Sequence, residues 1–155
     1  MSKPEKIATL LRPERIILDI KSNDKTKALS EVAGLLQQNG CVTDFKTFFG
    51  EILQREQVSN TALGHDVAIP HARTDQCREI VIAVGRSQQG IDFEAKDGQP
   101  VRLIFLIGTP KAMVTDYLRV VGNLARLLRR DELRQALLDA PDSAAFIQAL
   151  EQAEG

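Results

Sequence analysis

The sequence predicts an α/β protein, a single compact domain in which helices flank a central mixed β-sheet on both faces. Three observations lead to this fold class. The 155 residues suit one ordinary domain, and a hydrophobic fraction of 43% is sufficient for a buried core. A strand, two helices, several strands and three helices follow one another along the chain. No repeat, low-complexity segment or linker interrupts this order, so we expect residues 1–155 to form the one domain.

The first predicted strand and helix lie in the N-terminal part of the chain. Residues 15–20 are rich in β-branched side chains, which favours a strand. Ser22-Asn23-Asp24 follows and supplies residue types that cap the N-terminus of a helix. Apolar residues then recur at i, i+3, i+4 and i+7, and Asn39-Gly40 ends the helix. These apolar residues are Leu29, Val32, Ala33 and Leu36.

A second helix is predicted to begin near Thr43-Asp44 and to carry Arg55 and Glu56 in its last turn. Its apolar stripe contains most of the phenylalanines of the chain, and we interpret it as core packing rather than as a cofactor site. The stripe consists of Phe45, Phe48, Phe49, Ile52 and Leu53.

The helical period is lost between residues 58 and 73, where polar residues, Gly64 and Pro70 indicate a loop with one short strand. Two stronger strands follow at residues 80–84 and 101–107, and both are apolar enough to be buried on two faces. Between them, residues 91–93 and the turn signal Asp97-Gly98 predict a short antiparallel strand.

The chain turns helical after Pro110, where one apolar stripe continues for three turns. The stripe consists of Tyr117, Val120, Val121, Leu124, Leu127 and Leu128. Two shorter helices are expected at residues 131–138 and 143–150, and Pro141 forces the break between them.

Composition restricts where the protein works and what it binds. Twenty Lys and Arg against 21 Asp and Glu leave a formal charge of -1, which does not favour nucleic acid or an anionic membrane as a partner. The opening segment, residues 1–6, is charged, and no apolar run is long enough for a bilayer span or a signal sequence, so a cytoplasmic protein is expected. Cys41 and Cys77 are expected to be free thiols that pack as small hydrophobes.

His65 and His71 are the only histidines, and they lie six residues apart in the irregular segment. Irregular segments on a rigid scaffold are common places for functional sites. Pro70 restricts Ile69 to extended geometry and so stiffens the backbone at His71. Imidazole has an ordinary pKa near 6.5 and is mostly neutral at cytoplasmic pH, so a ring nitrogen can attack phosphorus. His71 is therefore a candidate phosphoryl acceptor, although the residues alone would favour a half-buried structural histidine.

Phosphoryl transfer needs positive charge and hydrogen-bond donors around three oxygens. Arg55 and Arg73 offer charge, and Ser59, Asn60 and Thr61 offer donors. Arg55 is favoured, because a guanidinium at a helix end can bind a phosphoryl group with two parallel hydrogen bonds. The alternative is that Arg55 only caps the helix carbonyls.

Other chemistries find no matching pattern. His65, His71 and Cys77 lack the spacing of a zinc knuckle or of a helical metal site, and we predict no metal or other cofactor. A phosphate-binding Walker loop, a GxGxxG fingerprint and the GxSxG elbow of hydrolases are absent from the sequence, which leaves nucleotide binding and serine hydrolysis without support.

The run from Arg55 to Arg73, which contains Ala-Ile-Pro-His at residues 68–71, resembles the active-site signature of enzyme IIA domains of the phosphotransferase system. The similar branch is the fructose, mannitol and nitrogen-regulatory class, and the resemblance continues through residues 90–93 and 97–101 to the helix after Pro110. It implies one IIA-type α/β domain in which His71 receives a phosphoryl group from an HPr-like carrier. A IIB domain or a regulatory target would follow downstream.

The resemblance also implies roles for individual residues. Arg55 corresponds to the phosphoryl-stabilising arginine of the family, and Thr61 to a hydroxyl in the active-site loop. Asn60 departs from the usual Thr or Ser of that loop, and Ala62 from the usual Gly. Tyr117 stands where many members carry a second active-site histidine. His71 and Arg55 favour a phosphohistidine carrier with a transport or regulatory role, whereas Tyr117 favours the alternative, a regulatory module that signals by docking alone.

Overall fold

Two long antiparallel strands, β5 (Val81–Ile91) and β6 (Val101–Pro110), form the centre of the fold. The computed structural model describes residues 6–155, so residues 1–5 of the charged opening segment lie outside the described residues. Most side chains of β5 and β6 are buried, as their apolar sequences predicted. In the described part of the chain, no helix is both long and apolar enough to cross a membrane.

The separate strand predicted at residues 91–93 is not formed, because β5 itself continues to Ile91 and pairs there with Val101 of β6. Residues 85–90 are polar or glycine, so the sequence did not predict this extension of β5. Arg86 can be buried in it because its guanidinium donates to the carbonyls of Leu18, Leu137 and Ala140, at 3.2, 3.0 and 2.8 Å. The predicted turn does lie between the strands, with Gly98 at φ +70°.

The other strands are short. The strand predicted at residues 15–20 is reduced to β1 (Ile16–Ile17), which runs parallel to β5. Arg15 belongs to a 3-10 turn, Pro13–Arg15, that precedes the strand. The irregular segment contains three strands instead of the predicted one: β2 (Ala62–Gly64), β3 (Val67–Ala68) and β4 (His71–Thr74). β3 and β4 lie one after the other along the same edge of β6, both parallel to it. The sheet is therefore mixed, in the order β1-β5-β6-β3-β2, with β4 beside β6.

Six helices of the described residues cover this sheet. The predicted helices are α2 (Lys25–Gln38), α3 (Phe45–Val58), α4 (Val114–Leu127), α5 (Asp131–Asp139) and α6 (Ser143–Glu154). Asp24, Asp44 and Asp142 cap α2, α3 and α6 through their carboxylates. A short helix, α1 (Ile7–Leu10), precedes them and was not predicted.

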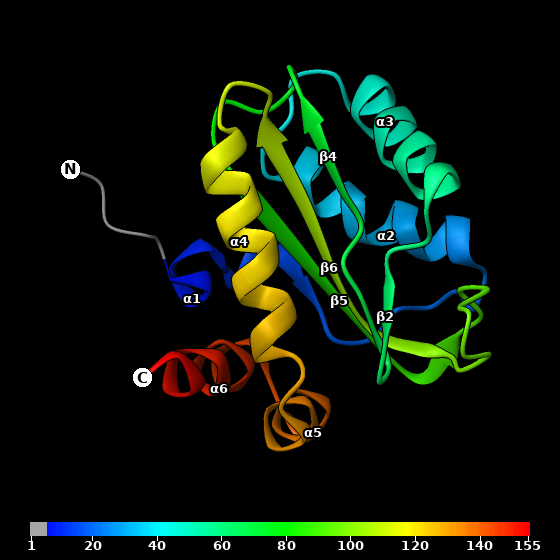
Figure 1. Ribbon diagram of the computed structural model, residues 1–155, viewed down its shortest axis with the longest axis vertical. Helices are drawn as coiled ribbons and strands as arrows, with labels where there is room; N and C mark the ends of the chain where they lie inside the picture. Colours follow the sequence, from blue (N-terminus) through cyan, green and yellow to red (C-terminus); the bar gives the residue numbers. More distant parts are fainter. Residues whose placement is uncertain (1–5) are drawn as a thin grey trace.

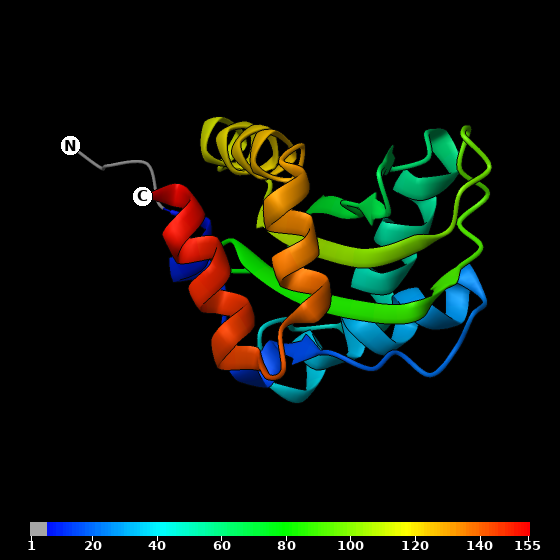
Figure 2. The same ribbon diagram turned by 90° about the horizontal axis from the view of Figure 1, so that it is seen from below.

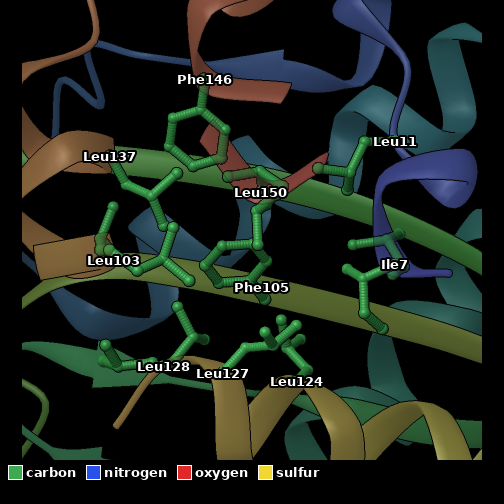
Figure 3. Packing of buried hydrophobic residues seen from close by; sticks show 14 of the residues in the cluster. Ile7, Leu11, Leu103, Phe105, Leu124, Leu127, Leu128, Leu137, Phe146 and Leu150 are labelled. Carbon is green, nitrogen blue, oxygen red and sulfur yellow. The ribbon is translucent and has the colours of Figure 1, made fainter. Parts of the chain in front are cut away.

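The helices form two layers, as Figures 1 and 2 show: α2 and α3 cover one face of the sheet, and α1, α4, α5 and α6 the other. Each face has its own apolar core. Phe105 of β6, Phe146 and Leu150 of α6, and Leu124 of α4 meet in one of them (Figure 3). The opposite core contains Phe48 and Ile52 of the α3 stripe. The α/β sandwich predicted from the sequence is thus confirmed.

Candidate active site at His71

His71 lies at the first position of β4, immediately after a break in the edge of the sheet. β3 ends at Ala68, and Pro70, which has no amide hydrogen, cannot continue a regular ladder. The chain stays beside β6 across the break because the carbonyl of Pro70 accepts from the amide of Ile107 at 2.9 Å. His71 then pairs with Ile107 in register. The imidazole is therefore attached to backbone that is fixed on both sides.

The His71 ring is almost buried, with 8% of the residue exposed, and one nitrogen is tied to the backbone. Nδ1 lies 2.7 Å from the carbonyl oxygen of Ile69. A carbonyl can only accept, so Nδ1 carries the proton, and the neutral ring keeps its lone pair on Nε2. Burial lowers the pKa of His71 below its ordinary value; the Ile69 hydrogen bond opposes this, and the charge of Arg55 adds to it. The environment thus favours the neutral ring, with its lone pair on Nε2.

Arg55 makes a helix-capping contact and also lines the pocket at His71. It lies in the last turn of α3, and Nη1 donates to the carbonyl of Ser59 at 2.9 Å, which caps the helix. The same guanidinium lines a pocket with His71, and its charge acts on the imidazole. Capping uses one of its five N–H donors, and four remain for another ligand.

Tyr117 of α4 faces His71 from the opposite wall. The two ring centroids are 5.4 Å apart, and the ring planes are inclined by 49°. Both residues line the same pocket. A phenol in this place can donate one hydrogen bond, whereas a protonated imidazole would add a charge. β4 runs between α3 and α4 in Figure 1, which explains how residues 55, 71 and 117 meet.

The pocket is open and has a volume of about 630 Å³. Two further cations, Arg73 and Lys111, line it together with the carboxylate of Glu51. Arg73 follows His71 by two residues on one strand, so both side chains point to the same face of the sheet. Lys111 lies just after β6 and forms an exposed ion pair of 3.4 Å with Asp75. The sequence did not single out Lys111, which the β4–β6 register brings to the site.

Apolar side chains surround the pocket mouth. Val58, Val114 and Leu118 line it, and they are 79%, 39% and 61% exposed. We call these three residues the apolar collar. Large hydrophobic side chains are rarely left this exposed in one cluster unless another surface covers them. Each belongs to the end or the outer side of a helix, so helical periodicity alone had no reason to single it out.

Asn60 and Thr61, predicted as donors in the active-site loop, do not line this pocket. The side-chain Nδ2 of Asn60 donates to the backbone carbonyls of Phe93 and Glu94, at 2.7 and 3.2 Å. The hydroxyl of Thr61 donates to the carboxylate of Glu56, whose oxygens lie 3.0 and 2.8 Å away. In this structure both side chains hold the loop in place.

His65 lies apart from His71, in the tight turn between β2 and β3. His65 and Asp66 have φ of 54° and 74°, the left-handed pair of a two-residue hairpin turn. Asp66 is anchored by two hydrogen bonds from Arg102, at 3.2 and 2.9 Å. Within residues 6–155, no three His, Cys, Asp or Glu side chains gather as a group that could hold a metal ion.

Comparisons with known proteins identify the family of the chain. The family model described as "Phosphoenolpyruvate-dependent sugar phosphotransferase system, EIIA 2" matches residues 9–153. A fructose-specific EIIABC component from Bacillus subtilis is 37% identical over 147 residues, which are 95% of this chain but 23% of that protein. A nitrogen regulatory protein from Bradyrhizobium diazoefficiens is 36% identical over 93% of this chain and 94% of its own length.

A solved structure is also similar over nearly the whole chain. The crystal structure of nitrogen regulatory protein IIA-Ntr from Neisseria meningitidis superposes with a TM-score of 0.87 at 28% identity. The match covers 93% of this chain and 98% of the Neisseria chain. The fold is therefore shared with a nitrogen regulatory protein.

Proposed function

We propose that this chain, which belongs to the EIIA 2 family of the phosphoenolpyruvate-dependent sugar phosphotransferase system, carries a phosphoryl group on Nε2 of His71. Family membership makes it a phosphotransfer component. The observation that supports His71 best is its hydrogen bond to Ile69: with Nδ1 protonated, Nε2 is left as the nucleophile in a pocket lined by Arg55, Arg73 and Lys111.

The reaction is an exchange between two imidazoles. The Nε2 lone pair of His71 attacks the phosphorus of a phosphohistidine on an HPr-like carrier, and the N–P bond of the carrier breaks with its electron pair returning to the carrier nitrogen. The His71 ring gains positive charge as the new bond forms, and the Ile69 carbonyl stabilises the proton on Nδ1. The arginines and Lys111 neutralise the phosphoryl oxygens. The step requires no cofactor.

The apolar collar supports a protein rather than a small molecule as phosphoryl donor. Val58, Val114 and Leu118 surround the nucleophile with exposed apolar surface, which a folded partner can cover while its own histidine reaches Nε2. We infer that the HPr-like carrier docks here and that a downstream IIB domain or regulatory target uses the same face. The name of the Bacillus relative, EIIABC, is consistent with a IIB partner, and that of the Bradyrhizobium relative with regulation. We place the exchange in the cytoplasm.

Phosphorus NMR tests the proposed atom. After incubation with phosphoenolpyruvate, enzyme I and the carrier, uniformly 15N-labelled protein should show one phosphohistidine signal coupled to Nε2 of His71. A phosphoryl group on Nδ1 would contradict the proposed tautomer, since that nitrogen donates to Ile69. Binding of the carrier without any phosphohistidine signal would favour the alternative, a docking module that keeps the IIA fold; Tyr117 in place of a second histidine supports that alternative.

A further inference from the structure

The turn that follows α3, residues 59–61, is held by two consecutive side chains of that helix. Arg55 donates to the carbonyl of Ser59, and Glu56 accepts from the amide of Thr61 at 2.9 Å. Successive helical side chains point about 100° apart, so Arg55 faces the pocket while Glu56 turns into the protein. The position of the Ser59 carbonyl, which orients the Arg55 guanidinium, therefore depends on the anchoring of Thr61.

The Glu56 carboxylate is deeply buried, with 4% of its side chain exposed. Both oxygens accept from the Thr61 hydroxyl, and Oε1 also accepts from the Thr61 amide. Lys25, the first residue of α2, supplies the compensating charge, with Nζ 3.2 Å from Oε1. A buried carboxylate is tolerated only with such partners, and removal of one partner leaves the others uncompensated.

Lys25 extends this network to a second segment. Its ammonium group lies over the ring of Phe93, 4.5 Å from the centroid. The carbonyl of Phe93 in turn accepts from Asn60, which lies inside the turn. The turn is therefore fixed from α2, from α3 and from the segment after β5. Lys25, Glu56 and Phe93, which supply these contacts, do not line the pocket. We call Lys25, Glu56 and Thr61 the anchoring network.

We infer that Glu56 is a positioning residue for phosphoryl transfer: its buried carboxylate holds the turn whose Ser59 carbonyl orients Arg55 toward His71. This inference rests on the function proposed at His71. Apart from geometry, the negative charge of Glu56 raises the pKa of His71, which opposes the larger effect of burial and the effect of Arg55. Glu56 thus acts on both groups of the site without touching the phosphoryl group.

The decisive variant is Glu56→Gln, which keeps the size of the side chain but loses the charge and one acceptor. We expect kcat of phosphoryl acceptance to fall roughly tenfold, with KM for the carrier within about twofold, because the apolar collar is unchanged. Thr61→Val should also lower kcat. Thr61→Ser should keep kcat near the wild-type value, because serine retains the hydroxyl that donates to Glu56. Glu31→Gln is the matched control, since Glu31 also holds a loop, through the amides of Lys21 and Ser22 at 3.1 and 3.0 Å.

Two NMR signals separate positioning from plain stabilisation. In Glu56→Gln, the Nε–H signal of Arg55 should move, and the pKa of His71 should fall further. In Glu31→Gln, both should stay as in wild type. An unchanged kcat, or an unmoved Arg55 signal, in folded Glu56→Gln overturns the inference. Should that variant not fold, the Thr61→Val and Thr61→Ser pair provides the same comparison.

The same measurements distinguish this inference from the proposed function. If wild-type protein accepts no phosphoryl group, the proposed function fails, and the Arg55 and His71 signals still decide whether Glu56 positions Arg55. Movement of both signals in Glu56→Gln then supports the positioning, and their constancy overturns it. If wild type is phosphorylated and Glu56→Gln transfers equally well, only the inference fails.

Discussion

At the scale of single residues, the environment of His71 favours its neutral form. Burial lowers the pKa of the imidazole and the Arg55 charge lowers it further, whereas the Ile69 hydrogen bond and Glu56 raise it. The net direction is downward from 6.5. Only a neutral ring can attack phosphorus, so His71, the proposed nucleophile, should stay reactive to lower pH than an exposed histidine would.

This direction gives a pH prediction. The rate of phosphoryl acceptance should stay level as the pH falls from 7.5 towards about 6.5, and should decline only as the pH passes through the lowered pKa of His71. Single-turnover rates measured beside an NMR titration of the ring check it. A midpoint at or above 6.5 in either measurement would contradict the described environment of the ring.

Substitution of Arg55 tests whether this residue binds the phosphoryl group or only caps α3. Arg55→Ala should slow transfer roughly a hundredfold, because a charged donor aimed at the phosphoryl oxygens is lost. The transfer rate of Arg55→Lys should lie between those of wild type and Arg55→Ala, since lysine keeps the charge but lacks the planar guanidinium. Rapid-quench kinetics and the melting temperature should be measured together. A lower melting temperature with an unchanged transfer rate in folded Arg55→Ala would show that Arg55 only stabilises the end of α3 through Ser59.

Tyr117 offers a test by gain of function. Its ring faces His71 at 5.4 Å, where a histidine could hydrogen-bond to the incoming phosphate and carry a charge. Tyr117→His should therefore accept phosphate faster or retain it longer, most clearly below about pH 6.5, where the new imidazole is protonated. The measurements are transfer rate, phosphohistidine lifetime and melting temperature. A less stable variant with an identical pH profile of transfer would show that Tyr117 only packs.

At the scale of secondary-structure elements, α3 and α4 supply the apolar collar that we propose as the docking surface. Leu118→Asp, on α4, should raise KM for the carrier about tenfold while kcat and the melting temperature stay near wild type, because the side chain is already 61% exposed. Leu63→Asp is the matched control, since Leu63 is also exposed but does not line the pocket. Equal KM values for the carrier in the two variants would show that the apolar collar is not part of the docking surface.

The sequence predicted the helices better than the strands, and the reason is physical. Asp24 and Asp44 are N-cap residues whose type alone predicts where a helix begins, and the apolar periodicity that follows predicts how far it extends. The extension of β5 contains buried Arg86, whose partners come from residues 18, 137 and 140, so no local window could reveal it. The β2–β3 turn was equally hidden, because His65-Asp66 is not the usual Asn-Gly pair.

The site was predictable in part for the same reason. His71 was singled out by its scarcity and by Pro70, and Arg55 by its place at a helix end, but only the family resemblance favoured them over structural roles. Lys111 and Leu118 come from a distant part of the chain and reach His71 only through the pairing of β4 with β6 and the packing of α4. Glu56 was seen as a residue of the last helical turn, but its burial depends on Lys25 of another helix.

At the scale of the whole molecule, two apolar cores on opposite faces fix the sheet, and the site lies at the edge strand between them (Figure 1). His71 shares the face of α4, while its neighbour Ala72 packs into the core under α2 and α3. The pocket at His71 takes its charges from α3, β4 and the segment after β6. The fold thus places the proposed nucleophile, His71, beside the proposed docking surface.

The central claim, that His71 carries the phosphoryl group, is tested most directly by intact mass spectrometry of three proteins. Wild type, His71→Ala and His65→Ala are incubated with phosphoenolpyruvate, enzyme I and the HPr-like carrier. Wild type and His65→Ala should each gain one phosphoryl group that is labile in acid and stable in base, because a phosphohistidine contains an N–P bond, and His71→Ala should gain none. A phosphoryl group that is retained by His71→Ala, or lost only in His65→Ala, would contradict the account.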